Sequence, residues 1–153
     1  MSNERIRPPW WLKPLNKAFI VTTRLGLPVI GKEKPVVLTV PGRKSGRPRS
    51  TPVTPMLVDG KRYVVEGFPG ADWAANARAA GNATLQQGRN LTEQVRVVEL
   101  PPDEARPLLR QFPTLVPTGV EFMKKAGLVK DGRPEEFEAL AGRCAVFRFD
   151  PVS

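Results

Sequence analysis

Histidine is absent from this sequence of 153 residues, and cysteine occurs once. The absence of histidine excludes Ser-His-Asp triads, acid–base catalysis by imidazole and every zinc site with a histidine ligand. The single cysteine, Cys144, excludes a disulfide framework and a Cys-x-x-Cys metal or redox pair. This usage fits a reducing, cytosolic setting. Because free cysteines are usually buried, we expect Cys144 to be a small core residue of a strand.

The sequence also lacks a long hydrophobic run. No segment reaches the roughly 18 apolar residues of a membrane span, and residues 1–30 lack the uninterrupted apolar core and the cleavage site of a signal peptide. Residues 12–25 instead predict a short amphipathic helix behind Trp10 and Trp11. This helix either caps the domain, which we favour, or touches a membrane surface peripherally through its tryptophans.

Acidic residues are scarce relative to basic ones. The 24 lysines and arginines exceed the 15 aspartates and glutamates and leave a formal charge of +9. A surface of this sign attracts polyanions such as nucleic acid, anionic lipid, or a phosphorylated or polycarboxylate ligand. Charge alone does not choose among these ligands.

Short strands dominate the middle of the chain. Apolar and β-branched patterning predicts strands at residues 35–40, 49–58, 61–67, 83–88, 92–100 and 143–152. Asp59 and Gly60 give the strongest hairpin signal in the chain. Pro52 and Pro55 mark the second strand as an edge or bulged strand, because proline cannot donate to the hydrogen-bond ladder.

The expected helices gather late in the chain and at its ends. After the N-terminal helix they are predicted within residues 72–80, 101–112, 120–128 and 134–142, with Asp72 as an N-cap and Gly81 as a C-terminal stop. This order disfavours a doubly wound parallel sheet. We therefore expect a mainly β fold with helices (α+β). It would be one domain over residues 1–153, a small antiparallel barrel with peripheral helices and an N-terminal helical extension at about 1–30.

Four cations fall within seven residues of the stretch TVPGRKSGRPRSTPV, residues 39–53. They are Arg43, Lys44, Arg47 and Arg49, and expected strands flank them on both sides. Because like charges repel, such a cluster is either a solvated hairpin tip or a binding site for an anion. Arginine offers planar donor forks to phosphate, lysine a point charge, and Ser45 a hydroxyl donor.

The sequence GFPG, residues 67–70, follows the third expected strand. In a meander of three antiparallel strands, this loop lies at the same end of the sheet as the cationic turn. A glycine-rich loop exposes backbone N–H groups, and the N-terminus of the helix over residues 72–80 points to the same place. Together the three pieces predict an anion site at one end of the barrel.

The stretch LTVPGRKSGRPRSTPV, followed by a hairpin, GFPG and DWAANARA, resembles the deazaflavin-dependent nitroreductases. These are small split β-barrel proteins that use coenzyme F420, and they typically read T-x-x-G-R-K-S-G-x-x-R before a glycine loop and W-x-x-N after it. The likeness runs from about residue 36 to 89, and the final CAVFRFDPV strand is also similar. It implies a split β-barrel oxidoreductase that transfers a hydride from reduced F420 to a small flat acceptor.

The resemblance also implies which residues hold the cofactor. Arg43, Lys44 and Arg49 would hold its phosphate or glutamate tail. Residues 51–52 would line its ring or ribityl chain, and residues 67–70 would wrap the deazaflavin. For Trp73 we favour a core anchor, and for Asn76 a hydrogen bond from the helix to the loop. The complete set is Arg43, Lys44, Ser45, Arg49, Thr51, Pro52, Gly67, Phe68, Pro69, Gly70, Trp73 and Asn76.

The acceptor and its proton donor are not identified by the motifs. The only tyrosine, Tyr63, lies in an expected strand, whereas the family often lines its substrate side with aromatic and hydroxyl groups from late helices. A quinone therefore fits at least as well as a nitro compound. Phe112, Phe122 and Met123 either line that side or belong to the core, which we favour. Tyr63, Ser45 or a backbone N–H are equal candidates to polarise the acceptor.

Two other functions stay open. One is a split-barrel oxidoreductase that binds FMN, which has one phosphate and no glutamate tail and so needs fewer cations. The other is a non-enzymatic protein that binds an anionic ligand or a membrane surface. Nucleic acid is disfavoured because no aromatic side chains interleave the cations. A peripheral membrane contact is compatible with the enzyme, since quinones reside in lipid.

Overall fold

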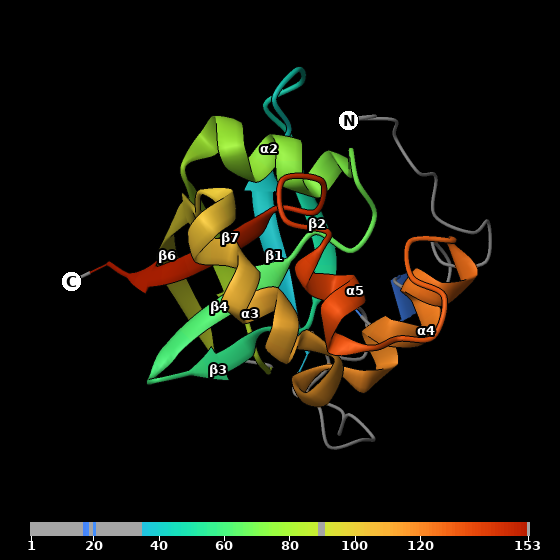
Figure 1. Cartoon of the computed structure of the whole chain (residues 1–153). Helices are drawn as coiled ribbons and strands as arrows, with labels where there is room; N and C mark the ends of the chain where they lie inside the picture. Colours follow the sequence, from blue (N-terminus) through green and yellow to red (C-terminus); the bar gives the residue numbers. More distant parts are fainter. Residues whose placement is uncertain (1–16, 19, 21–34, 89–90, 153) are drawn as a thin grey trace.

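An antiparallel sheet of seven strands carries much of the chain in the computed structural model, which describes residues 17–18, 20, 35–88 and 91–152 (Figure 1). The strands are β1 (Val36–Pro41), β2 (Pro48–Val53), β3 (Met56–Val58), β4 (Lys61–Val65), β5 (Asn82–Gln86), β6 (Thr92–Glu99) and β7 (Val146–Pro151). Within residues 35–88 and 91–152 the helices are α2 (Asp72–Ala80), α3 (Pro102–Leu115), α4 (Pro117–Lys125) and α5 (Pro134–Glu138). The prediction of an α+β fold is confirmed.

The sheet is curled into a half-barrel. Its strand order is β2-β1-β5-β6-β7-β4-β3, and each neighbouring pair is antiparallel. The outer strands β2 and β3 are separated in sequence only by Thr54 and Pro55. Because three Cα steps span at most roughly 11 Å, the sheet has to bend until its two outer strands approach each other.

The predicted meander of three strands is wrong. Residues 49–58 form two strands, of which β2 pairs with β1 and β3 pairs with β4. Pro55 has no backbone N–H, so it interrupts the ladder where the chain passes from one edge of the sheet to the other. Three strands therefore separate β1 from β4. Because neighbours alternate in direction, β1 and β4 still run the same way, and the loops after them leave the same end of the sheet.

The hairpin predicted from Asp59 and Gly60 is confirmed. The φ angles of these two residues are 50° and 76°, and two positive values are what a type I′ turn requires. Val58 and Lys61 face each other across the start of the ladder. The turn fixes the register of β3 on β4.

Both faces of the sheet are buried where helices cover them. On β7, Phe147 and Phe149 pack inside the barrel, whereas Val146 packs against the helices on the outer face. All three side chains are at most 2% exposed. Burial of one such side chain contributes about 1.5–3 kcal/mol to folding, so this strand holds the two clusters together.

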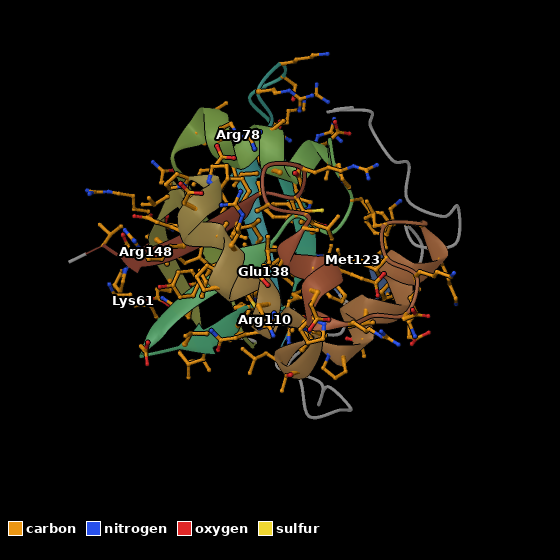
Figure 2. All side chains as sticks on the ribbon, viewed as in Figure 1. Lys61, Arg78, Arg110, Met123, Glu138 and Arg148 are labelled. Atoms are coloured by element: carbon orange, nitrogen blue, oxygen red, sulfur yellow. The ribbon has the colours of Figure 1, made fainter. Side chains whose placement is uncertain are left out.

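Helices α3, α4 and α5 gather on the outer face of the sheet (Figure 1). The ring of Phe112 in α3 lies 5.4 Å from that of Phe137 in α5, and Met123 of α4 is 1% exposed. Arg110 and Glu138 face each other across α3 and α5, with Nη1 2.8 Å from the carboxylate (Figure 2). Phe112 and Met123 are therefore core residues, as we favoured.

Helix α2 closes one end of the barrel, with Ala74 and Ala77 fully buried against the interior cluster. It stops at Gly81, whose φ of 75° is left-handed, so this predicted stop is confirmed. The predicted N-cap is wrong. Asp72 is the first helical residue and Ala71 holds the cap position. The carboxylate of Asp72 is drawn instead to Arg43, 3.4 Å away.

Cys144 is fully buried, as expected, but it lies in a bend just before β7 rather than in a strand. Its backbone N–H donates to the carbonyl of Leu140. Burial raises the pKa of the Cys144 thiol to about 12, and the nearby Glu66 carboxylate adds to the shift. The thiol is therefore a packing group and not a nucleophile.

The predicted N-terminal helix over residues 12–25 lies outside the described ranges, apart from residues 17, 18 and 20, which are helical. In the described part of the chain, every helix is too short or too polar to cross a membrane.

Candidate functional site

The basic turn, residues 43–49, joins β1 to β2 and includes the first two residues of β2. Two backbone hydrogen bonds close it, from Gly42 N to Arg47 O at 2.8 Å and from Gly46 N to Gly42 O at 2.9 Å. Gly46 has a φ of 73°, which a side chain would disfavour. Ser45 Oγ accepts from Arg47 N at 3.2 Å, so Ser45 also shapes the turn. In Figure 1 the basic turn projects beyond α2.

Arg43 folds back from the basic turn onto α2. Its backbone N–H and its Nη1 both donate to Oδ1 of Asn76, at 3.0 and 2.8 Å, and its Nη2 lies 3.4 Å from Asp72. Asn76 is 5% exposed, so this amide is a buried acceptor that needs its partner. These bonds join the helix to the basic turn, whereas the expected partner of Asn76 was the glycine loop. Arg43 thus anchors the turn, a role that the sequence did not predict.

The other cations of the basic turn point into solvent. Lys44, Arg47 and Arg49 are exposed, and none of their side chains forms an ion pair with another described residue. Three adjacent cations without acidic partners raise the local positive potential at the end of the barrel. This donor set matches an extended ligand with several negative charges.

The Gly-Phe-Pro-Gly loop, residues 67–70, connects β4 to α2. The N–H of Ala71 donates to the carbonyl of Phe68 at 3.0 Å, and Gly70 has a φ of 82°. Pro69 is buried, and Gly67 and Phe68 are half-buried. Through α2 and Asn76 this loop is tied to the basic turn, so the structure brings the two predicted loops together at one end of the barrel.

The remaining predicted residues fall into two groups. Trp73 is half-buried and packs edge-on against Phe147 with ring centroids 5.7 Å apart, which agrees with a core anchor. Thr51 and Pro52 are half-buried on β2, opposite Leu38 and Val37 of β1. No hydrogen bond within the described ranges joins Thr51 or Pro52 to the glycine loop.

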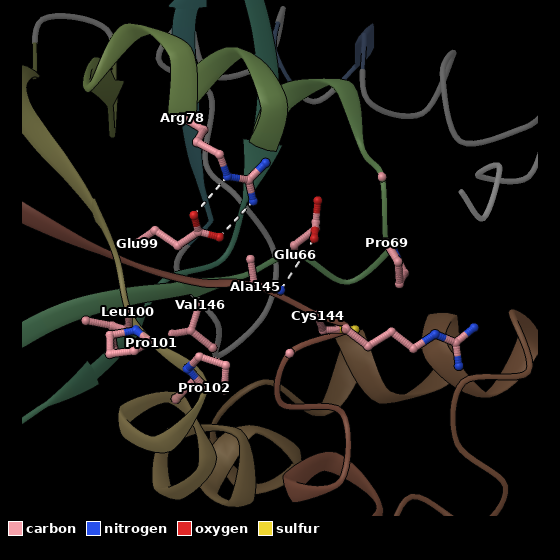
Figure 3. Close-up of a pocket in the computed structure, with 14 residues that line it drawn as sticks. Glu66, Pro69, Arg78, Glu99, Leu100, Pro101, Pro102, Cys144, Ala145 and Val146 are labelled. Carbon is pink, nitrogen blue, oxygen red and sulfur yellow. Dashed lines mark hydrogen bonds and ion pairs between the residues drawn. The ribbon is translucent and has the colours of Figure 1, made fainter. Parts of the chain in front are cut away.

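A pocket of about 540 Å³ adjoins the glycine loop (Figure 3). Five segments converge on it: residues 66–70 after β4, α2, the end of β6, the start of α3, and the turn before β7 with the first residue of that strand. Its lining residues are Glu66, Pro69, Gly70, Arg78, Glu99, Leu100, Pro101, Pro102, Ala105, Gly142, Arg143, Cys144, Ala145 and Val146. Apolar walls with a few charged groups are typical of small-molecule sites.

Glu66 is the buried carboxyl of this pocket, with 5% of the residue exposed. Its backbone N–H donates to the carbonyl of Ala145 at 2.8 Å, and its Oε1 lies 3.4 Å from the N–H of the same residue (Figure 3). Burial raises the pKa of Glu66, although the N–H groups of Ala145 and Gly70 and the charge of Arg78 oppose this shift. The carboxyl therefore has an increased tendency to stay protonated.

Two arginines line the pocket and differ in their interaction partners. Arg78 of α2 is neutralised by Glu99 through a two-pronged ion pair, with contacts of 2.9 and 2.8 Å, and lies over the ring of Phe147. The Nε of Arg143 is buried and has no hydrogen-bond partner in the described part of the chain. A buried donor without an acceptor is costly, so this atom is a candidate to bind a ligand.

Sequence reasoning missed the charged residues of this pocket. The sequence did offer an indication for Glu66. A carboxylate between buried strand residues and a glycine loop is expected to be buried itself and to need a partner. The sequence offered no indication for Arg78, Glu99 and Arg143. They are separated along the chain and come together only through the packing of α2 and β7.

Comparison with solved structures places the fold among split barrels. The chain is similar to an F420-H2-dependent reductase (FDR-A), with 22% identity, a TM-score of 0.53, and 82% of this chain and 100% of the other covered. A domain-swapped dimer aligns with 20% identity and a TM-score of 0.54, covering 92% and 97%. A FAD-binding protein from Mesorhizobium loti aligns with 18% identity and a TM-score of 0.51, covering 89% and 90%. The comparison with curated proteins found no match.

The family comparison covers most of the chain. Residues 19–126 match the F420H(2)-dependent quinone reductase family. The matched segment contains the basic turn, the glycine loop, α2 and the pocket residues from Glu66 to Ala105. The chain therefore belongs to the F420H(2)-dependent quinone reductase family and is an oxidoreductase that uses F420 as its cofactor.

Proposed function

We propose that this enzyme passes a hydride from reduced F420 to a small flat acceptor, a quinone before a nitro compound. The family description supports a quinone. The apolar walls of the pocket, formed by Leu100, Pro101, Pro102 and Val146, favour a planar ring of low polarity.

Binding of the cofactor is supported by the exposed cations Lys44, Arg47 and Arg49. They have no acidic partners among the described residues. Coenzyme F420 carries a phosphate and a glutamate tail, and charge-assisted hydrogen bonds to such groups are the strong ones. Lys44 and Arg49 hold the anionic tail, with Ser45 as a further donor. Arg43 acts as a positioning residue, because Asn76 and Asp72 already engage it.

The ring end of the cofactor lies between β2 and the glycine loop in this proposal. Thr51 and Pro52 flank the ring or the ribityl chain, Gly67 to Gly70 wrap it, and Trp73 and Asn76 hold the helix behind the loop. When bound, reduced F420 supplies the hydride. The protein orients the two reactants and excludes water from between them.

We also propose that the N-terminal segment makes a peripheral contact with the membrane. Trp10 and Trp11 precede the amphipathic pattern of residues 12–25, and a peripheral contact would bring the enzyme to lipid-dissolved quinones. Cosedimentation with vesicles of anionic lipid tests this contact. The full chain should pellet with the vesicles, and a variant with both tryptophans replaced by serine should stay in the supernatant.

The proposed reaction is tested by following the absorbance of reduced F420. Oxidation should require enzyme and menadione, and should be slower with a nitroaromatic compound of similar size. FMN should bind weakly, because it lacks the glutamate tail. If FMN binds at micromolar concentration while F420 does not, or if no quinone is reduced, the proposal is wrong.

Reversing the charge of two cations in the basic turn tests this binding site, and Arg43 is not suitable as one of the two. Because Arg43 donates twice to buried Asn76 and faces Asp72, glutamate at 43 would repel Asp72 and leave the amide unpaired. Lys44 and Arg49 are exposed and make no such contacts, so K44E/R49E is the pair that separates binding from folding.

A further inference from the structure

We infer that the pocket beside the glycine loop is the acceptor site, in which Arg143 donates to an oxygen of the quinone and Glu66 delivers the proton that completes its reduction. The inference rests on the proposed function and adds to it the location of the acceptor and the residues that act on it. None of the sequence motifs points to either residue.

The first argument is the unpartnered donor. Nε of Arg143 is buried in the wall of a pocket of about 540 Å³ without an acceptor in the described ranges. Its side chain also forms no ion pair there, in contrast to Arg78, which Glu99 neutralises. A quinone oxygen is a neutral acceptor whose charge becomes negative as hydride arrives, so a fixed guanidinium favours the reduced state.

The second argument is the buried carboxyl. Glu66 is 95% buried, reaches the same pocket and stands directly before the glycine loop. Figure 3 shows its carboxylate between Arg78 and Pro69, two other residues that line the pocket. Its hydrogen bond to Ala145 is long, 3.4 Å. The N–H of Gly70 is a second donor to this carboxylate. Because a carboxylate can accept about four hydrogen bonds, its oxygens retain capacity for a ligand.

The chemistry balances with these groups. Reduction of a quinone to a hydroquinone adds one hydride and one proton. In the proposed function, bound reduced F420 would supply the hydride. The Glu66 carboxyl supplies the proton to the oxygen that gains negative charge. Glu66 then takes a proton from water through the mouth of the pocket.

The surroundings of Glu66 set the pH dependence. The charged and titratable groups that face it are Arg78 from α2, Glu99 from the end of β6, and Arg143 and Cys144 from the turn before β7. Of these, Cys144 has a pKa raised to about 12, far above the range in which a carboxyl titrates. The catalytic rate should therefore fall as pH rises through the raised pKa of Glu66.

The first experiment measures binding without the cofactor. Menadione is titrated into the apo-protein, and quenching of tryptophan fluorescence reports binding, because Trp73 contacts Phe147 beneath Arg78. R143M should weaken binding about tenfold or more. The control R110M removes an arginine that pairs with Glu138 outside the pocket and should bind as the wild type does. Equal affinity of R143M and the wild type would overturn the inference.

The second experiment measures the rate at which menadione oxidises enzyme-bound reduced F420 in a single turnover. E66Q keeps the side-chain oxygen that faces Ala145 but cannot supply the proton, so its rate should fall roughly 100-fold with an unchanged dissociation constant for menadione. Its rate should also lose the pH dependence. The control E93Q removes a carboxylate that pairs with Arg62 and should behave as the wild type. Melting temperatures establish that all variants are folded.

The outcomes separate this inference from the proposed function. A wild-type enzyme that reduces menadione while R143M and E66Q match it overturns the inference and leaves the proposed function standing. A wild-type enzyme that reduces no quinone overturns both. Selective loss of menadione affinity in R143M, together with selective loss of rate in E66Q, supports the inference.

Discussion

Asn76 shows how one buried amide supports a surface loop. Its Oδ1 accepts from the backbone N–H and the Nη1 of Arg43, on a residue separated from it by more than thirty positions. We predict that N76A lowers the free energy of unfolding by about 2 kcal/mol, because two donors, one of them a backbone N–H, lose their acceptor. Urea denaturation measures this change.

A matched control distinguishes the effect of the hydrogen bonds to Asn76 from the effect of the charge of Asp72. Asp72 is 59% exposed and meets Arg43 at 3.4 Å, so D72N should change stability by no more than about 0.5 kcal/mol. If N76A and D72N are equally destabilised, the amide does not anchor the turn.

Glu66 gives a second prediction, on stability against pH. Its ordinary pKa of 4.5 is raised in the folded protein, mainly by burial. The native state therefore holds this proton more tightly than the unfolded state. The resulting stability is fully present below about pH 4.5 and is lost as pH rises through the folded pKa. E66Q, which has no charge to bury, should gain stability relative to the wild type over that interval.

Denaturant unfolding at pH 4, 6 and 8 measures the difference between E66Q and the wild type. A difference that stays constant across the three values would show that Glu66 titrates alike in both states, contrary to its burial.

At the scale of single residues, sequence and structure agree where chemistry is local. The sequence predicted the turn residues Asp59 and Gly60 and the stop at Gly81, because positive φ angles favour glycine and aspartate. It misplaced Arg43, whose role depends on a helix that arrives about thirty residues later. It also missed Arg143, whose burial is a property of the assembled fold.

Among the elements, α5 is a short helix whose start is stabilised by hydrogen bonds to Glu136 in its first turn. Glu136 accepts backbone N–H groups from Lys130, Asp131 and Arg133 at 2.5, 3.0 and 3.0 Å. These bonds lower the pKa of Glu136 to about 2. Because the folded pKa lies below the ordinary value of 4.5, the stabilisation is present above about pH 4.5 and is lost as pH falls through about 2.

A third prediction follows for this element. E136Q should loosen the loop over residues 130–133, because a neutral amide is a weaker acceptor than a carboxylate. Hydrogen exchange at Lys130, Asp131 and Arg133 should accelerate severalfold, while exchange in β7 stays unchanged. Unaltered exchange at these three amides would contradict the account.

The strands show why the sequence could not predict the sheet order. Patterning found the strands because alternation and β-branching are properties of a segment. It could not show that Thr54 and Pro55 divide one segment between two partners at opposite edges of the sheet. That division is decided by barrel closure, which involves all seven strands.

For the whole molecule, charge and topology act together. The formal charge of +9 draws an anionic cofactor toward the protein, and the parallel direction of β1 and β4 places both loops at one end of the barrel. The sequence predicted this end as the cofactor site by resemblance. The pocket that adjoins it could not be predicted, because its walls come from five segments that meet only after folding.

The account depends on the basic turn binding the anionic tail of F420. The most direct test compares the affinities of F420 and of the same deazaflavin without phosphate and glutamate, for the wild type and K44E/R49E. Removing two charge-assisted contacts should weaken F420 binding roughly 100-fold or more, and should leave the affinity for the tail-free compound nearly unchanged. Equal losses for the two compounds, or no loss for F420, would contradict the account.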